Sequence, residues 1–407
     1  MEEQKKTISK YFFYLISVCY ATEGIVDVVV GSAWPVIAES LKVDISLIGI
    51  LVMVYYLGSI VTSPNTYKIR NRIGTNYTMV LSQILYAIAL LLYLIAPNIY
   101  AFAAGMFING IGCGLMEVNA NSYVLKAYDV KEESFLSGFW GVGSIIGSTV
   151  MAFAVKFNPP YQRGFIILIA MLIVNIILLL LAKRSWKKQK LKLDKALVDI
   201  HSVTEEEKTA HAKITDLIKN KNVIIILMCF FLGHSVIVTL NSLVSTIAVN
   251  QACIDEKDAV GITILFFTSI FIGRMLFGHF SNKLSVIKVL KTNIMITILL
   301  FILLSISSFK GPLICVITIL IGFVLSPIIP FLNAYIKELF NAKHLSALLG
   351  YADVSAIIGI IVLSGLLTPI IKITSLQCLE LVYAGILFVL YLLLVRTEKD
   401  SDTFDTK

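Results

Sequence analysis

Long apolar segments, each followed by a short polar one, make up most of the chain. A helix of about 20 residues crosses the roughly 30 Å hydrocarbon core of a membrane, because each residue adds about 1.5 Å. Apolar runs of that length predict twelve membrane-spanning helices, at residues 11–38, 45–66, 77–96, 99–125, 134–157, 163–183, 222–249, 258–281, 287–308, 311–338, 344–371 and 376–396. We therefore expect an all-α membrane protein.

The composition agrees with this expectation. Of the 407 residues, 57% are hydrophobic and 15% are charged, and soluble domains seldom combine such values. The first apolar run is too long for the core of a signal peptide and contains Glu23 and Asp27. We therefore expect it to remain in the mature protein.

Lysine and arginine concentrate in alternate loops, which the positive-inside rule assigns to the cytoplasm. The opposite loops carry only scattered positive residues, namely Lys42, Lys156, Arg163, Lys257, Lys310 and Lys372. We expect a plasma-membrane protein with both termini in the cytoplasm. The net charge of +8 then reflects orientation in the lipid bilayer, and no basic patch on a folded soluble face indicates a nucleic-acid partner.

The six cysteines stand singly in or beside the apolar runs, with no CxxC pair and no zinc-ligand spacing. We interpret them as packing residues. We expect no metal site and no cofactor, and we expect the chain to be a monomer.

A long polar stretch divides the chain, and the parts on either side of it resemble each other. Residues 184–221 form this stretch, so we predict an N-terminal half at 1–183, a cytoplasmic linker at 184–221 and a C-terminal half at 222–407. GFWGVGSIIG at 138–147 matches GYADVSAIIG at 350–359, and NSYV at 121–124 matches NAYI at 333–336, with the same offset of 212. Two six-helix halves in parallel repeat, with a solute site between them, are typical of the major facilitator architecture.

Three motifs carry a narrower resemblance. The segment GIGCGLMEVNAN at 110–121 is similar to the fourth helix of the fucose:proton symporter family, which includes bacterial fucose and glucose/mannose carriers. GRMLFGHFSNK at 273–283 resembles the eighth-helix loop motif of the superfamily, although Asn282 replaces the usual aspartate. SPIIP at 326–330 resembles the proline-bearing tenth helix. The first-half loop SPNTYK at 63–68 departs further from the motif.

The resemblance implies roles for two acidic residues. It implies that Glu117 takes part in proton coupling and in sugar binding. When the first helix is aligned on Pro35, the coupling aspartate of the fucose carrier falls on Gly31. Asp27 lies one helical turn deeper, about 6 Å away, and is a less direct match.

The intramembrane carboxylates are the main candidates for coupling, because an ionised group at the centre of a span costs roughly 3 kcal/mol on insertion scales. Glu23 and Asp27 are four residues apart and share a helix face, so we expect one of them to hold a proton at neutral pH. Glu117 and Asn121 share a face in the same way, whereas Asn119 points elsewhere. We predict solute contacts from Glu117, Asn121, Asp27 and the ring of Trp140, and we expect Trp34 to lie at the membrane interface.

The second half supplies candidates for an opposing wall. His234 and Asn241 lie on roughly one helix face, and Asn333 repeats Asn121. Each also has a purely structural interpretation, because polar side chains often bridge helices in membranes. We assign Arg274, Lys283 and Asp353 to gating.

These features favour a secondary active transporter, with proton-coupled uptake of a monosaccharide or similar small polar solute as the leading hypothesis. Sodium remains an alternative coupling ion. Proton-driven efflux of drugs or metabolites is a second hypothesis, although residues 141–147 lack the Gly-Pro step of many antiporters. A membrane sensor is a remote third. No P-loop, HExxH or GxSxG motif in context indicates an enzyme.

Overall fold

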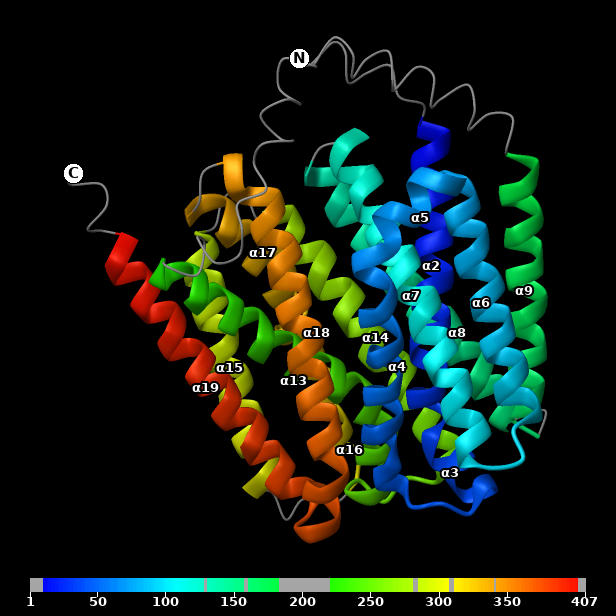
Figure 1. Ribbon diagram of the computed structural model, residues 1–407. Coiled ribbons are helices and arrows are strands. Elements are labelled where there is room, and N and C mark those ends of the chain that lie inside the picture. The colour runs from blue at the N-terminus through cyan, green and yellow to red at the C-terminus, as the bar shows by residue number, and fades with distance from the viewer. Residues whose placement is uncertain are drawn as a thin grey trace. The chain divides into compact units, whose positions relative to one another are not determined.

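The computed structural model describes residues 10–127, 130–156, 160–182, 220–280, 285–306, 311–339 and 342–401, and every regular element in these ranges is a helix (Figure 1). Twelve helical segments of this part are long and apolar enough to cross a membrane. The predicted all-α class and the twelve predicted spans are therefore confirmed. The predicted linker lies outside the described residues except for its last two positions, so the predicted domain limits stay a prediction.

The described chain forms two compact units. The first contains α2 (Lys10–Ser32), α3 (Trp34–Leu41), the end of α4 (Ile48–Thr62), α5 (Thr66–Ile73), α6 (Thr75–Ile95), α7 (Ile99–Ala127), α8 (Val130–Lys156), α9 (Gln162–Leu181) and the start of α14 (Glu256–Phe280). Within it, α2 packs along α8, and α6 packs along α7 and α9. The helices that carry the predicted acidic residues are thus held by direct neighbours in one unit.

The second unit contains the remaining parts of α4 and α14 and five further spans. Its helices are α13 (Lys221–Asn250), α15 (Val286–Ile306), α16 (Pro312–Leu325), α17 (Ile328–Leu339), α18 (Ala342–Ile373) and α19 (Leu376–Ser401). Here α13 packs along α18, and α15 packs along α19. The pairing of α13 with α18 is the counterpart of α2 with α8.

Close helix contacts show that the internal repeat extends to three dimensions. Gly147 on α8 lies against the backbone of Ile25, and its repeat partner Gly359 on α18 lies against the backbone of Phe231. Ile25 and Phe231 are 206 positions apart. A second pair of contacts has the same spacing. Gly143 lies against the backbone of Ala21. Its repeat partner Ser355 donates a 2.8 Å hydrogen bond to the backbone oxygen of Leu227, which is 206 positions beyond Ala21.

The same correspondence relates α4 and α7 to α14 and α16. Gly58 lies against the backbone oxygen of Phe107, and Ser269, 211 positions further along, donates a 2.9 Å hydrogen bond to the backbone oxygen of Ile319. Gly110 lies against Tyr55. Its repeat partner Gly322 lies against Phe266, which is also 211 positions beyond Tyr55. Positions in the two units can therefore be paired residue by residue.

Two spans are interrupted near prolines, which cannot donate a backbone hydrogen bond to a helix. The first span breaks into α2 and α3 around Ala33, with Pro35 in the first turn of α3. The tenth breaks into α16 and α17, and Pro327 lies in the gap. The fourth span, α7, is continuous and carries Glu117. The interruption of the tenth span therefore has no counterpart in the fourth.

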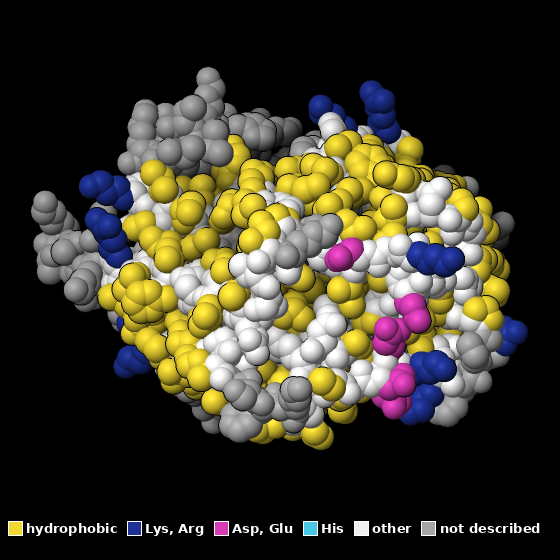
Figure 2. Space-filling view, turned by 90° about the horizontal axis from the view of Figure 1, so that it is seen from below, with side chains coloured by type: hydrophobic (Ala, Val, Ile, Leu, Met, Phe, Trp, Pro, Cys, Tyr) yellow, Lys and Arg dark blue, Asp and Glu magenta, His cyan; other side chains and the backbone are white. Residues whose placement is uncertain are grey.

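Many large apolar side chains are exposed on the surface of the helices, as expected of helices that face lipid. On α9 the exposed side chains are Ile166, Ile167, Met171, Ile173, Val174, Ile177, Leu178, Leu180 and Leu181. Figure 2, seen from the lower ends of the helices in Figure 1, shows hydrophobic side chains over much of this face, with basic and acidic side chains among them. The exposed apolar side chains of α9 agree with a helix that faces lipid.

Candidate functional site

Helix α2 carries two carboxylates one turn apart, on the side of the helix that faces the interior of the first unit. The side chain of Glu23 is 2% exposed, and that of Asp27 is half-buried. Both lie inside a span whose window is 67% buried. Glu23 and Asp27 thus lie one turn apart on α2, the first buried and the second half-buried.

Both oxygens of the Asp27 carboxylate accept hydrogen bonds from neighbouring helices. The hydroxyl of Tyr55 on α4 donates to Oδ1. The indole Nε1 of Trp140 on α8 donates to Oδ2 at 3.0 Å. Such hydrogen bonds to an ionised acceptor are stronger than those between neutral groups. The Asp27 side chain on α2 is therefore hydrogen-bonded to both α4 and α8.

Glu23 faces α7. The thiol of Cys113 donates to Glu23 Oε1 at 3.3 Å. Glu117, one turn further along α7, lies beside them, and one ligand atom of each of the three residues lies within 4.8 Å of the other two. The second oxygen of Glu23, Oε2, is buried and accepts no hydrogen bond from the described residues.

Glycine makes this arrangement possible at two of the places where helices cross closely. A Cβ atom at Gly24 would overlap the backbone of Trp140, and one at Gly110 would overlap the backbone of Tyr55. The side chains that donate to Asp27 come from these same residues. Gly24 thus allows α8 to approach α2 closely at Trp140, and Gly110 allows α4 to approach α7 closely at Tyr55.

The two asparagines of α7 have separate environments. Asn119 is fully buried and donates a 3.1 Å hydrogen bond to the backbone oxygen of Thr75 on α6. This contact fits the prediction that Asn119 faces away from Glu117. Asn121 belongs to α7, but its side chain lies outside the described residues.

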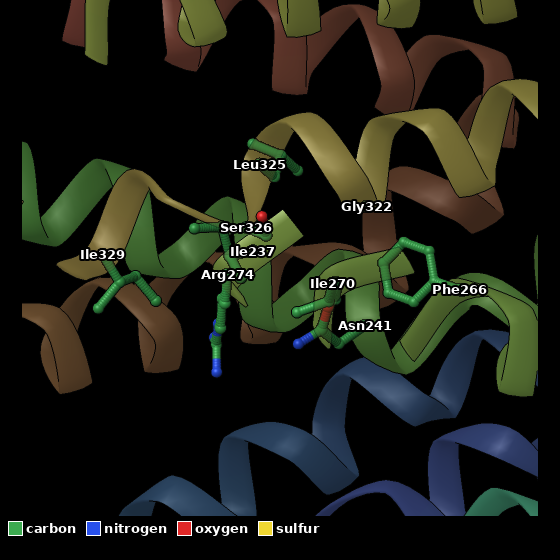
Figure 3. Close-up of a pocket in the computed structure, with 9 residues that line it drawn as sticks. All are labelled: Ile237, Asn241, Phe266, Ile270, Arg274, Gly322, Leu325, Ser326 and Ile329. Atoms are coloured by element: carbon green, nitrogen blue, oxygen red, sulfur yellow. The ribbon is translucent and has the colours of Figure 1, made fainter. Parts of the chain in front are cut away.

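Among the second-unit candidates, the structure brings Asn241 on α13 together with Arg274 on α14. Both line a small cavity of about 10 Å³ whose other walls are Ile237, Phe266, Ile270, Gly322, Leu325, Ser326 and Ile329. Figure 3 shows the side chains of Asn241 and Arg274 below those of Leu325 and Ser326. The cavity has room for about one water molecule, so a monosaccharide does not fit in it.

The other predicted residues of this unit are not among those lining the cavity. His234 is half-buried and stacks on Phe230, with ring centroids 5.3 Å apart. Asn333 is half-buried on α17, and Asp353 is exposed on α18. Lys283 lies outside the described residues.

The expected position of Trp34 at the membrane interface is wrong. Trp34 is fully buried and donates a 2.5 Å hydrogen bond to the backbone oxygen of Ile45. Cys113, expected to be a packing residue, also donates to Glu23, and its position four residues before Glu117 places it on the same helix face. Tyr55 and the buried Glu380 on α19 are not among the predicted residues, because no local motif marks either of them.

Comparison with known proteins points to one family. Residues 16–310 match the family model described as the Major Facilitator Superfamily. The glucose/mannose transporter GlcP of Bacillus subtilis (strain 168) is 24% identical over 359 residues, which cover 84% of this chain and 85% of that protein. An uncharacterized transporter, y4wD of Sinorhizobium fredii (strain NBRC 101917 / NGR234), is 24% identical over 122 residues, 29% of this chain and 32% of that one.

A solved structure has the same fold. FucP, a transporter of the same superfamily crystallised in an outward conformation, superposes with a TM-score of 0.62 at 16% identity, covering 94% of this chain and 97% of that one. At this identity the likeness establishes the fold alone. Together with the family match, it confirms the family resemblance inferred from the motifs.

Proposed function

The chain belongs to the Major Facilitator Superfamily, and we propose that it is a proton-coupled importer of a sugar or a similar small polar solute, working by alternating access. As a member of this family with twelve apolar helices, it is a multi-pass integral membrane protein. The family consists of transporters and supports a function other than catalysis. The coupling ion, the solute and the direction of transport are the parts of the proposal that need experiment.

The observation that carries the proposal is the paired carboxylates of α2. Glu23 is buried beside Cys113 and Glu117, whereas Asp27, one turn away, accepts hydrogen bonds from Tyr55 and Trp140. Two acids in such different surroundings do not hold a proton equally well, and the charge of one affects the other. A proton bound here alters the charge that a solute meets at Glu117 and Asp27. This is the reciprocal coupling that a symporter requires.

The nature of the solute rests on chemistry and on relatives. Carboxylate and amide groups can both satisfy sugar hydroxyls, and the flat ring of Trp140 offers an apolar face beside Asp27. A relative of nearly the same length is described as a glucose/mannose transporter. We therefore propose a monosaccharide as the solute. Asn121, His234, Asn241 and Asn333 are further proposed contacts.

Orientation and gating follow from the distribution of charge. We propose a plasma-membrane monomer with both termini in the cytoplasm, because lysine and arginine concentrate in the loops on that side. Arg274, Lys283 and Asp353 are proposed to act in gating. Protons are the proposed coupling ion, and sodium is the alternative that the experiment below separates from them.

Uptake into proteoliposomes tests the proposal directly. Purified protein is reconstituted, an inside-alkaline pH gradient is imposed in sodium-free buffer, and accumulation of labelled glucose, mannose and fucose is followed. We expect at least one sugar to accumulate and a protonophore to abolish its accumulation. Accumulation that persists without the pH gradient but requires sodium contradicts proton coupling. If the pH gradient drives sugar out of the proteoliposomes and not into them, the result contradicts uptake and favours efflux.

A further inference from the structure

We propose that Glu23, Cys113 and Glu117 form a binding site for a thiophilic divalent cation, with Zn²⁺ and Cd²⁺ as the ions that fit its ligands. The site lies in the first unit, between α2 and α7. It shares two carboxylates with the proposed coupling machinery, but its existence does not depend on which solute is transported.

The spacing of the ligand atoms is suited to a single ion. Cys113 Sγ lies 3.3 Å from Glu23 Oε1, and each of the three ligand atoms is within 4.8 Å of the other two. In a tetrahedral zinc site, sulfur lies about 2.3 Å and oxygen about 2.0–2.2 Å from the metal, so ligand atoms are about 3.3–3.7 Å apart. For a sulfur and an oxygen ligand the separation is about 3.5–3.7 Å, and the Cys113 to Glu23 pair at 3.3 Å is close to it. The two distances that involve Glu117 are at most 4.8 Å, so the Glu117 carboxylate has to move closer when an ion binds.

The ligand types select the class of metal. Carboxylates alone suit Mg²⁺ and Ca²⁺, but both ions prefer six or more oxygen ligands. A thiolate among the ligands favours zinc and softer ions over these. With three protein ligands the fourth position is left for water, as in open zinc sites.

A further observation points to a ligand at this place. Glu23 is 2% exposed, and its Oε2 accepts no hydrogen bond from the described residues. A buried carboxylate oxygen without a donor is costly, and a cation would satisfy it. Glu117 is half-buried, so it is the least enclosed of the three ligands.

Binding requires a proton balance. The ligand is the thiolate, so the Cys113 thiol loses its proton to solvent when the ion binds, and any proton held by the two carboxyl groups leaves with it. The bound ion then occupies the carboxylates that the proposed function uses for protons. If the proposed function is correct, Zn²⁺ therefore inhibits coupled uptake.

The binding test uses the purified full chain with the exposed cysteines replaced, Cys253→Ser and Cys378→Ser, so that neither can contribute sulfur. Zn²⁺ is titrated by calorimetry, and Cd²⁺ by its ultraviolet thiolate charge-transfer absorption. We expect one ion per chain. Cys113→Ser should weaken Zn²⁺ binding about tenfold or more and remove the Cd²⁺ band. Cys229→Ser is the matched control, because Cys229 is equally buried and occupies the repeat position of Glu23, and it should change neither signal.

X-ray absorption at the zinc edge of the same background protein guards against variants that fail to fold. One sulfur at about 2.3 Å from zinc supports the proposal. Zinc bound by oxygen and nitrogen alone, undiminished binding by Cys113→Ser, or no binding to the folded protein overturns it. These measurements involve no transport, so a failure of the proposed uptake activity is distinguished from a failure of the metal site.

Discussion

In the first unit α2 packs along α8 and carries one buried and one half-buried carboxylate, whereas in the second unit α13 packs along α18 and has no carboxylate at the matching positions. With the offset of 206 set by the helix contacts, Glu23 corresponds to Cys229 and Asp27 to Gly233. Tyr55, which donates to Asp27, corresponds to Phe266. The hydroxyl donor and its acceptor are thus both missing at the matching positions of the second unit.

The comparison extends to the walls of the small cavity in the second unit. Ile329, one of its lining residues, is the repeat position of Glu117, and Ile237 is the repeat position of Gly31. The close contacts of Gly147 and Gly359, and of Gly110 and Gly322, are shared by both units. The repeat therefore preserves the close contacts between helices. The carboxyl groups at the positions of Glu23, Asp27 and Glu117 occur in the first unit alone.

The largest expected effect tests whether the acids of the first unit are special. Asp27→Asn keeps the size of the side chain but removes its charge, so proton-driven accumulation should fall by about 100-fold, near the upper end of ordinary coupling between two sites. Initial rates in proteoliposomes measure this. Glu380→Gln, which neutralises a buried carboxylate of the second unit, is the control and should retain accumulation. Equal losses in both variants would break the distinction between the units.

A smaller effect is expected from the donor to Asp27. Tyr55→Phe removes the hydroxyl and gives α4 the side chain that Phe266 supplies in the second unit. A hydrogen bond to a charged group contributes about 1.5–3 kcal/mol, so we expect coupled uptake to fall by about tenfold. Tyr383→Phe, at a buried tyrosine of the second unit, should leave uptake unchanged. Wild-type uptake by Tyr55→Phe would show that the hydroxyl has no part in coupling.

The shared packing predicts an effect of similar size in both units. In Gly147→Ala and in Gly359→Ala, the new methyl group meets the backbone of the partner helix, and overpacking of this kind costs about 1–3 kcal/mol. Thermal unfolding in detergent should show comparable decreases in stability. Gly261→Ala serves as the control, because nothing lies within 4 Å of the added atom. A decrease confined to one unit would argue against equivalent packing.

The smallest effect is expected at Asn119. Its hydrogen bond to the backbone oxygen of Thr75 joins α7 to α6, and polar contacts between membrane helices contribute about 0.6 kcal/mol on average. Asn119→Ala should therefore lower the melting temperature slightly and leave the ratio of accumulated to external solute unchanged. A change in that ratio without loss of stability would assign Asn119 to the transport site.

The fold was predictable because its signals are local. Apolar runs of span length mark the helices, and the matching segments at 138–147 and 350–359 mark the repeat. The tenth span was predicted as one helix at 311–338, and the structure divides it into α16 and α17 beside Pro327. Glycines allow α8 and α2 to pack closely. The sequence does not show which glycine contacts which backbone.

The site was predictable only where its members share a helix. Glu23 and Asp27 are one turn apart, as are Cys113 and Glu117, and that spacing alone places each pair on one face. The contacts of Asp27 with Tyr55 and Trp140, and of Glu23 with Cys113, join helices far apart along the chain. Such contacts depend on how α2, α4, α7 and α8 pack, and no motif within one segment encodes them.

The central claim is that the first unit's carboxylates couple protons to solute, and Glu117→Gln tests it most directly. Exchange of labelled for unlabelled sugar across proteoliposomes and accumulation driven by a pH gradient are measured on the same preparation. We predict that Glu117→Gln retains exchange and loses gradient-driven accumulation, because solute still binds and crosses without its proton. Accumulation at the wild-type level in Glu117→Gln would contradict the account.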